Sequence, residues 1–223
     1  MERHRTAAIG FWSSTALAIL AIIYLATLAL YFGIAGFVFP PSAIVQTVAG
    51  VITFATAPLM VVVFSAIREV PGSRSLLGTI SLSFTVLFAA VVSMNRFVQL
   101  TVIHQAPQGA ATPDLARFLP YSTDSVMFAM EMLGWGFFMA LAALAAAPMF
   151  NGDRLGRALR WTLVAYGLLS LLSVVGYATE TALTMAGFIA WGPGLIALGV
   201  LLALHFRRDG IRASVDVGCT GSS

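Results

Sequence analysis

The sequence predicts an all-α membrane protein that crosses the bilayer six times. Of its 223 residues, 59% are hydrophobic and only 9% are charged, and the mean hydropathy is +0.93. Soluble domains are about 45–50% apolar and about 25% charged, so this composition excludes a soluble globular enzyme, a disordered chain and a disulfide-stapled secreted module. A helix needs about 20 mostly apolar residues to cross the hydrocarbon core, and the chain contains six such runs.

Residues that end helices or turn the chain separate these runs. Pro40-Pro41 closes the first run, Pro71-Gly72 follows the second, and Asn151-Gly152-Asp153 follows the fourth. The predicted spans are Ile9–Phe37, Ala43–Ile67, Leu76–Ile103, Ser125–Phe150, Ala158–Ala178 and Ala182–Phe206. The first run is far longer than the roughly 7–15 apolar residues of a signal peptide, so it is interpreted as an uncleaved helix.

The spans form a single predicted transmembrane domain over residues 1–208. The polar remainder, 209–223, is predicted to be a disordered tail, and it carries the only cysteine of the sequence, Cys219. One cysteine excludes a disulfide within the chain, and a thiol in a flexible tail lacks the neighbouring base that would activate it.

The arginines predict the orientation of the protein. All 12 basic residues are arginine, and the formal net charge of +3 is too small to suggest a nucleic-acid partner. With a cytoplasmic N-terminus, ten arginines fall on the inner side, Arg117 falls on the outer side, and Arg96 falls inside a span. Cytoplasmic loops carry the excess of basic residues. Both termini are therefore predicted to be cytoplasmic, in a multi-pass protein of the cell membrane.

Several membrane chemistries lack the residues that they need. There is no lysine for a retinal Schiff base, and His4, His104 and His205 lie at span ends or in the N-terminal tail rather than where a membrane haem takes its ligands. No zinc-type Cys/His spacing, HExxH, Walker A or GxGxxG motif occurs. We therefore expect no cofactor and no metal ion.

Two ionisable residues fall inside the predicted spans. Arg96 lies seven residues before the outer end of the third span, and Glu131 lies six residues after the outer start of the fourth. With a rise of about 1.5 Å per residue, both lie roughly 10 Å below the outer surface. Consecutive spans are antiparallel and buried charges are usually paired, so the sequence predicts an Arg96–Glu131 ion pair.

Other polar and aromatic residues gather in the same half of the spans. Asn95 and Gln99 share a face with Arg96, Trp135 shares one with Glu131, and Tyr177 belongs to a polar stripe on the fifth span. The inner halves carry mainly small hydroxyl residues, which argues against a channel. The pattern predicts an outward-facing polar pocket. Its candidate ligand-binding residues are Asn95, Arg96, Gln99, Glu131, Trp135 and Tyr177.

Two spans carry residues that distort helices. Pro58 lies in the middle of the second span and Trp191-Gly192-Pro193-Gly194 near the middle of the sixth. Proline removes a backbone hydrogen bond, and broken helices recur at transporter binding sites. Kinked helices are also common in membrane proteins that transport nothing, so the pattern alone leaves both interpretations open.

Two sequence segments resemble those of a known family. The segment from Asn95 to Thr101 reads Asn-Arg-Phe-Val-Gln-Leu-Thr, and Glu131 to Trp135 reads Glu-Met-Leu-Gly-Trp. They are similar to the Asn-x-x-x-Gln-Leu-Thr and Glu-x-Leu-Gly-aromatic motifs of an uncharacterised family of small bacterial six-helix integral membrane proteins. Arg96 stands where that family typically has an aromatic residue. The resemblance implies a bacterial inner-membrane protein and no particular activity.

Three functional hypotheses follow. The leading one is a protein that binds or transports a small amphipathic or lipid-like ligand through the polar pocket, surrounded by membrane lipids. The second is an accessory or scaffold subunit in which the Arg96–Glu131 pair only joins helices. The third is an intramembrane enzyme that uses Glu131 as acid or base, with His104 at the rim of the pocket. The alanine-rich run Ala140–Ala147 suits contacts within or between subunits, so a homo-oligomer is a further candidate assembly.

Overall fold

The computed structural model describes residues 2–36, 38, 41–69, 76–103, 118 and 125–220. This part of the chain is helical and contains no strand, and six of its helical spans are long and apolar enough to cross a membrane. The all-α, six-span fold predicted from the sequence is therefore confirmed.

Three of the spans are uninterrupted α-helices, and the other three change helix type along their length. The uninterrupted spans are α1 (Glu2–Ala35), α2 (Ala43–Arg68) and α7 (Arg154–Ala178). The third span consists of α3 (Leu76–Val98) and the π-helix η1 (Gln99–Ile103). The fourth consists of α5 (Val126–Glu131), the π-helix η2 (Met132–Phe138), α6 (Met139–Ala146) and the short 3₁₀ turn η3 (Ala147–Met149). The sixth consists of η4 (Ala182–Met185), α8 (Ala186–Ile189), the π-helix η5 (Ala190–Gly194) and α9 (Leu195–Thr220).

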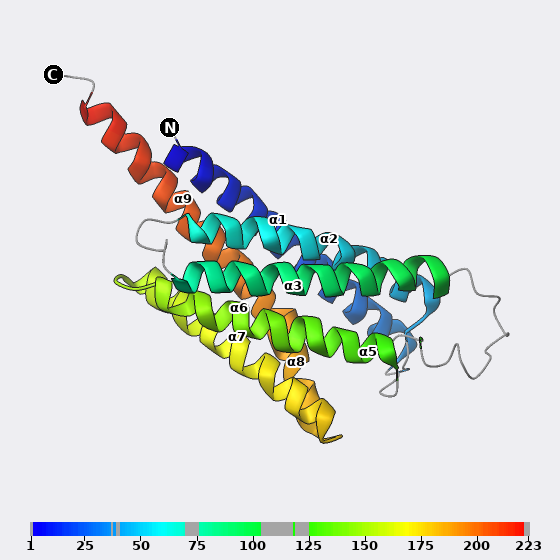
Figure 1. Cartoon of the computed structure of the whole chain (residues 1–223). Helices are drawn as coiled ribbons and strands as arrows, with labels where there is room; N and C mark the ends of the chain where they lie inside the picture. Colours follow the sequence, from blue (N-terminus) through cyan, green and yellow to red (C-terminus); the bar gives the residue numbers. More distant parts are fainter. Residues whose placement is uncertain are drawn as a thin grey trace.

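The spans form a ring in which each one packs on the next. α1 contacts α2, α2 contacts α3, α3 contacts the fourth span, and α7 lies between the fourth and sixth spans. The ring closes through an extensive contact between α1 and α9, and both chain ends lie at the same end of the bundle (Figure 1). Fully buried apolar side chains fill the interior, including Leu17, Phe64, Phe88, Met139 and Leu198.

The described arginines, apart from Arg96, lie at the end of the bundle that holds the chain termini. There Arg208 forms an ion pair with Asp153. The Asp153 side chain also caps α7, because its Oδ1 accepts a hydrogen bond of 2.9 Å from the backbone N–H of Gly156. This cap explains why α7 begins at Arg154, four residues before the predicted start of the span.

The C-terminal segment differs from the sequence prediction. α9 continues as a helix to Thr220, whereas a disordered tail was expected from Asp209 onwards. α1 likewise begins at Glu2 rather than at Ile9, so the two helices extend alongside each other. A Cβ on Gly210 would lie 3.5 Å from that of Ala7, and His205 Nε2 lies 3.4 Å from Asp209 Oδ2. The contact with α1 thus supports the first part of this segment, around Gly210.

Candidate functional site

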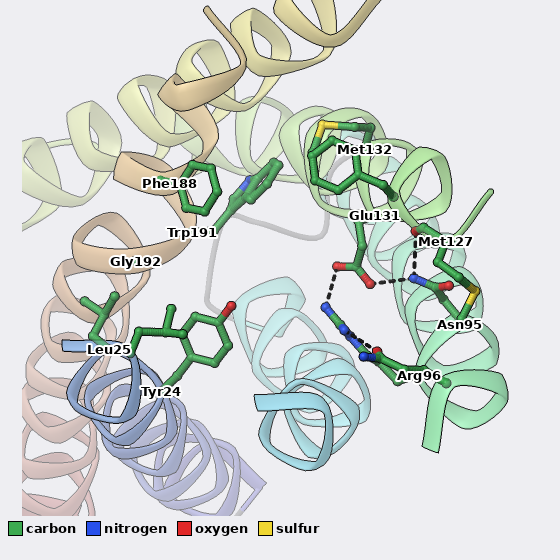
Figure 2. A pocket seen from close by; sticks show the side chains of 13 residues that line it. Tyr24, Leu25, Asn95, Arg96, Met127, Glu131, Met132, Phe188, Trp191 and Gly192 are labelled. Atoms are coloured by element: carbon green, nitrogen blue, oxygen red, sulfur yellow. Dashed lines mark hydrogen bonds and ion pairs between the residues drawn. The ribbon is translucent and has the colours of Figure 1, made fainter. Parts of the chain in front are cut away.

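A cavity of about 150 Å³ lies in the half of the bundle away from the chain termini. Residues from the first, third, fourth and sixth spans meet there (Figure 2). The lining residues are Tyr24, Leu25, Leu28, Asn95, Arg96, Gln99, Met127, Phe128, Glu131, Met132, Phe188, Trp191 and Gly192. The cavity therefore has a polar wall on the third and fourth spans and a mainly apolar wall on the first and sixth.

An ion pair occupies the centre of the polar wall. Arg96 Nη2 lies 3.0 Å from Glu131 Oε2, and the two side chains are only 8% and 14% exposed. Asn95 Nδ2 donates to Glu131 Oε1 at 2.6 Å, and Arg96 Nη1 donates to Gln99 Oε1. The predicted Arg96–Glu131 pair is thus confirmed, and the two flanking amides hold both charges in place (Figure 2).

A glycine allows the two spans that carry this pair to approach closely. Gly134, one helical turn after Glu131, faces α3, and a Cβ there would lie only 2.6 Å from Val92 Cγ2. The side chain of Val92 occupies the space that a larger residue would fill. The close contact brings Asn95 and Arg96 within hydrogen-bonding reach of Glu131.

Among the described residues, the three π-helical segments all border this cavity. Gln99 opens η1, Met132 opens η2, and η5 contributes Trp191 and Gly192. A π-helix contains one extra residue per turn, which shifts the side chains that follow it around the helix axis, and such segments are frequent at functional sites. In η5 the distortion has a visible cause, because Pro193 has no N–H to donate to the helix.

The apolar wall is aromatic on the sixth span and aliphatic on the first. Phe188 and Trp191 lie across the cavity from the ion pair, Leu25 lies beside them, and the hydroxyl of Tyr24 points toward the pair (Figure 2). Trp191 is fixed by the α7 span, since its Nε1 donates to Ser170 Oγ at 3.0 Å. The site thus combines fixed charges with a rigid aromatic surface.

A second cavity of about 70 Å³ lies deeper in the bundle. It shares Tyr24, Arg96, Glu131 and Trp191 with the first cavity, and it adds residues from the middle of α2. Thr53 and Thr56 line it, and their hydroxyls donate 2.8 Å hydrogen bonds to carbonyls of their own helix. Because Arg96 and Glu131 line both cavities, the ion pair stands at the boundary between them.

Most of the site residues predicted from the sequence lie together. The first cavity is lined by Asn95, Arg96, Gln99 and Glu131, and the second cavity is lined by Trp135. Tyr177 lines neither of the two cavities. Its ring packs against Phe128, with ring centroids 5.4 Å apart, so Tyr177 supports a lining residue from behind.

The polar stripe on α7 joins helices rather than lining the cavity. Ser170 accepts the hydrogen bond from Trp191. Ser173 donates to the carbonyl oxygen of Thr184 at 2.8 Å and so ties η4 to α7. His104, the residue suggested for the rim of the pocket, lies outside the described part of the chain.

Sequence reasoning did not place the aromatic and aliphatic lining of the cavity. Phe128, Phe188, Leu25 and Leu28 carry no signal of their own, because lipid-facing and cavity-facing positions of a span are equally apolar.

Comparisons of this chain with protein-family models, curated proteins and solved structures find no match. The resemblance to the bacterial six-helix family therefore stays a prediction. Within the described residues, no group of three or more His, Cys, Asp or Glu side chains is placed to hold a metal ion.

Proposed function

We propose that this is an integral membrane protein that binds a small amphipathic ligand in the cavity beside Arg96 and Glu131. The observation that carries the proposal is the two-sided lining: a buried ion pair with its amides on one wall, and aromatic and aliphatic side chains on the other. Small-molecule sites are typically apolar concavities with a few fixed polar groups that orient the ligand.

The position of the cavity supports a ligand that enters from outside or from the outer leaflet. The arginine-rich end of the bundle is the one that the positive-inside rule assigns to the cytoplasm, and the cavity lies in the opposite half. The distorted helices beside it are compatible with transport as well as binding, because unwound segments can reposition side chains. Transport is a more specific proposal than binding. We also propose that the protein is located in a bacterial inner membrane.

A scaffold role is the second candidate, and one observation favours it. Both carboxylate oxygens of Glu131 already have partners on α3, namely Asn95 and Arg96, so the charges join two helices whether or not a ligand is present. The enzyme hypothesis pairs Glu131 with His104, which lies outside the described part of the chain.

Native mass spectrometry separates these two candidates. The protein purified in dodecyl maltoside should carry a co-purified adduct that is lost in Arg96→Gln and in Glu131→Gln while circular dichroism still shows a folded helical protein. Arg208→Gln is the matched control, since it breaks an ion pair at the far end of the bundle and should keep the adduct. An adduct of equal occupancy in all variants, or none in any folded preparation, would contradict ligand binding at this site.

The proposed orientation has a simple test in Cys219, the only cysteine of the sequence. It follows the sixth span, so a membrane-impermeant maleimide should label it in inside-out vesicles and leave it unlabelled in intact spheroplasts. A cysteine introduced at Ser42, which precedes the second span at the other end of the bundle, should show the opposite pattern in a Cys219→Ser background. Labelling of Cys219 in intact spheroplasts would invert the orientation.

A further inference from the structure

The charges around the two cavities are balanced. Among the described residues that line them, Arg96 and Glu131 are the only charged ones, and they neutralise each other at 3.0 Å. Both side chains are largely buried, and an uncompensated charge in a buried site is costly. A ligand with a single net charge would leave the site unbalanced, whereas a ligand that carries both signs would not.

The wall opposite the ion pair suits the positive part of such a ligand. Phe188 and Trp191 line the cavity across from the ion pair, Phe128 adds a ring from the fourth span, and the hydroxyl of Tyr24 points toward the pair. The faces of aromatic rings attract cations, and several rings around one space form the usual recognition site for methylated ammonium groups. The methyl groups of such a cation also match the apolar surface of these rings.

The negative part of the ligand has an equally specific partner. A guanidinium presents a fork of five N–H donors and can serve more than one acceptor at a time. Arg96 is presented to the cavity by Gln99 and Glu131, which fix its plane. The cavity of about 150 Å³ is the size that holds a benzene-sized molecule, so only the charged end of a larger ligand would lie inside it.

From these observations we infer that the cavity binds a small zwitterion, with its anionic group against Arg96 and its methylated ammonium between Glu131 and the aromatic wall. The inference rests on the proposed function and names the chemical class of its ligand. The same chemistry occurs in free betaine-type solutes and in the headgroup of choline lipids.

Four probes of nearly identical shape separate the contribution of each charge. Glycine betaine carries both charges, choline only the positive one, 3,3-dimethylbutyrate only the negative one, and 3,3-dimethylbutan-1-ol neither. Binding can be followed by tryptophan fluorescence in the Trp12→Phe/Trp161→Phe background, in neutral dodecyl maltoside. Trp12 and Trp161 are 68% and 67% exposed, and their removal leaves Trp135 and Trp191, which line the cavities, as reporters.

We expect glycine betaine to bind at least about tenfold more tightly than any of the three isosteres. A fifth probe, glycerophosphocholine, tests whether the ligand is the headgroup of a choline lipid. If it binds more tightly than glycine betaine, the ligand is a headgroup rather than a free solute. Preference for either zwitterion supports the inference. Equal or tighter binding of a singly charged or neutral isostere overturns it, and so does the absence of binding by every probe.

Two variants test whether charge balance sets the preference. Arg96→Gln leaves the carboxylate of Glu131 alone in the site, so choline should become the preferred probe. Glu131→Gln leaves Arg96, so 3,3-dimethylbutyrate should become preferred. A purely structural ion pair would not invert the order of the probes, and either variant suffices if the other does not fold.

Phe188 tests the aromatic wall without disturbing the bundle, because its side chain is 46% exposed. Phe188→Leu should weaken glycine betaine binding about tenfold and leave 3,3-dimethylbutan-1-ol within about twofold, while Phe188→Tyr should keep both. Equal losses for the two probes would contradict a cation–aromatic contact. A co-purified adduct that depends on Arg96, together with no zwitterion preference, would overturn this inference and leave the proposed function standing.

Discussion

Arg96→Gln should destabilise the protein by about 3–5 kcal/mol, and adding Glu131→Gln should restore most of that loss. The single change removes a partner from a pair that is 8% and 14% exposed, and it strands a buried carboxylate. The double variant leaves two neutral amides in contact, and an amide can both donate and accept a hydrogen bond. Unfolding of the two single variants and the double variant in dodecyl maltoside, compared as a double-mutant cycle, measures the coupling.

The ion pair between Arg208 and Asp153 provides the control for this cycle. Its side chains are 30% and 45% exposed, and exposed pairs contribute about 0–1 kcal/mol. Arg208→Gln should therefore change the free energy of unfolding by less than about 1 kcal/mol. Additive losses from Arg96→Gln and Glu131→Gln would show that the two charges are not coupled in the folded protein.

Gly176→Ala should cost about 3 kcal/mol, at the upper end of the usual effect of overpacking. A Cβ on Gly176 would overlap backbone atoms of Leu183 and Thr184, and backbone cannot move aside as a flexible side chain can. This contact docks η4 on α7, together with the hydrogen bond from Thr181 N–H to the carbonyl oxygen of Gly176 at 2.9 Å. The displaced η4 would also shift α8 and so move Phe188 away from the cavity.

Gly33→Ala is the matched control for this prediction. Gly33 lies in α1, and a Cβ there would meet nothing within 4 Å. Alanine is favoured over glycine in a helix by roughly 0.5–1 kcal/mol, so this variant should be neutral or slightly stabilised. Thermal unfolding followed by circular dichroism measures both variants, and equal melting temperatures for Gly176→Ala and the wild type would contradict the overlap.

The number and approximate bounds of the membrane spans were predictable from the sequence, because the bilayer sets the length of the apolar run that can cross it. Arg96 and Glu131 were predicted to meet because equal depth on consecutive antiparallel helices leaves little freedom. The distortion of the sixth span around Pro193 was predicted from the sequence. The π-helices η1 and η2 were not, because a sequence pattern read at a period of 3.6 residues does not register an extra residue in a helix.

The aromatic side of the cavity was missed for a related reason. Phe128 and Phe188 are as apolar as neighbours that face lipid, and only the folded arrangement shows which rings turn inward. Tyr177 illustrates the opposite error. Its place on the polar stripe of α7 suggested a lining residue, but the span rotates it against Phe128, one layer behind the cavity.

The contact between α1 and α9 also determines when this site can exist during synthesis of the chain. The ribosome delivers Tyr24 and Leu25 first, but Phe188 and Trp191, which complete the same wall, belong to the sixth span. Until that span inserts, the Arg96–Glu131 pair borders an incomplete ring that is open to lipid on one side. Under the proposed function, a ligand would bind only after the sixth span has inserted, and it would stabilise the closure that creates its cavity.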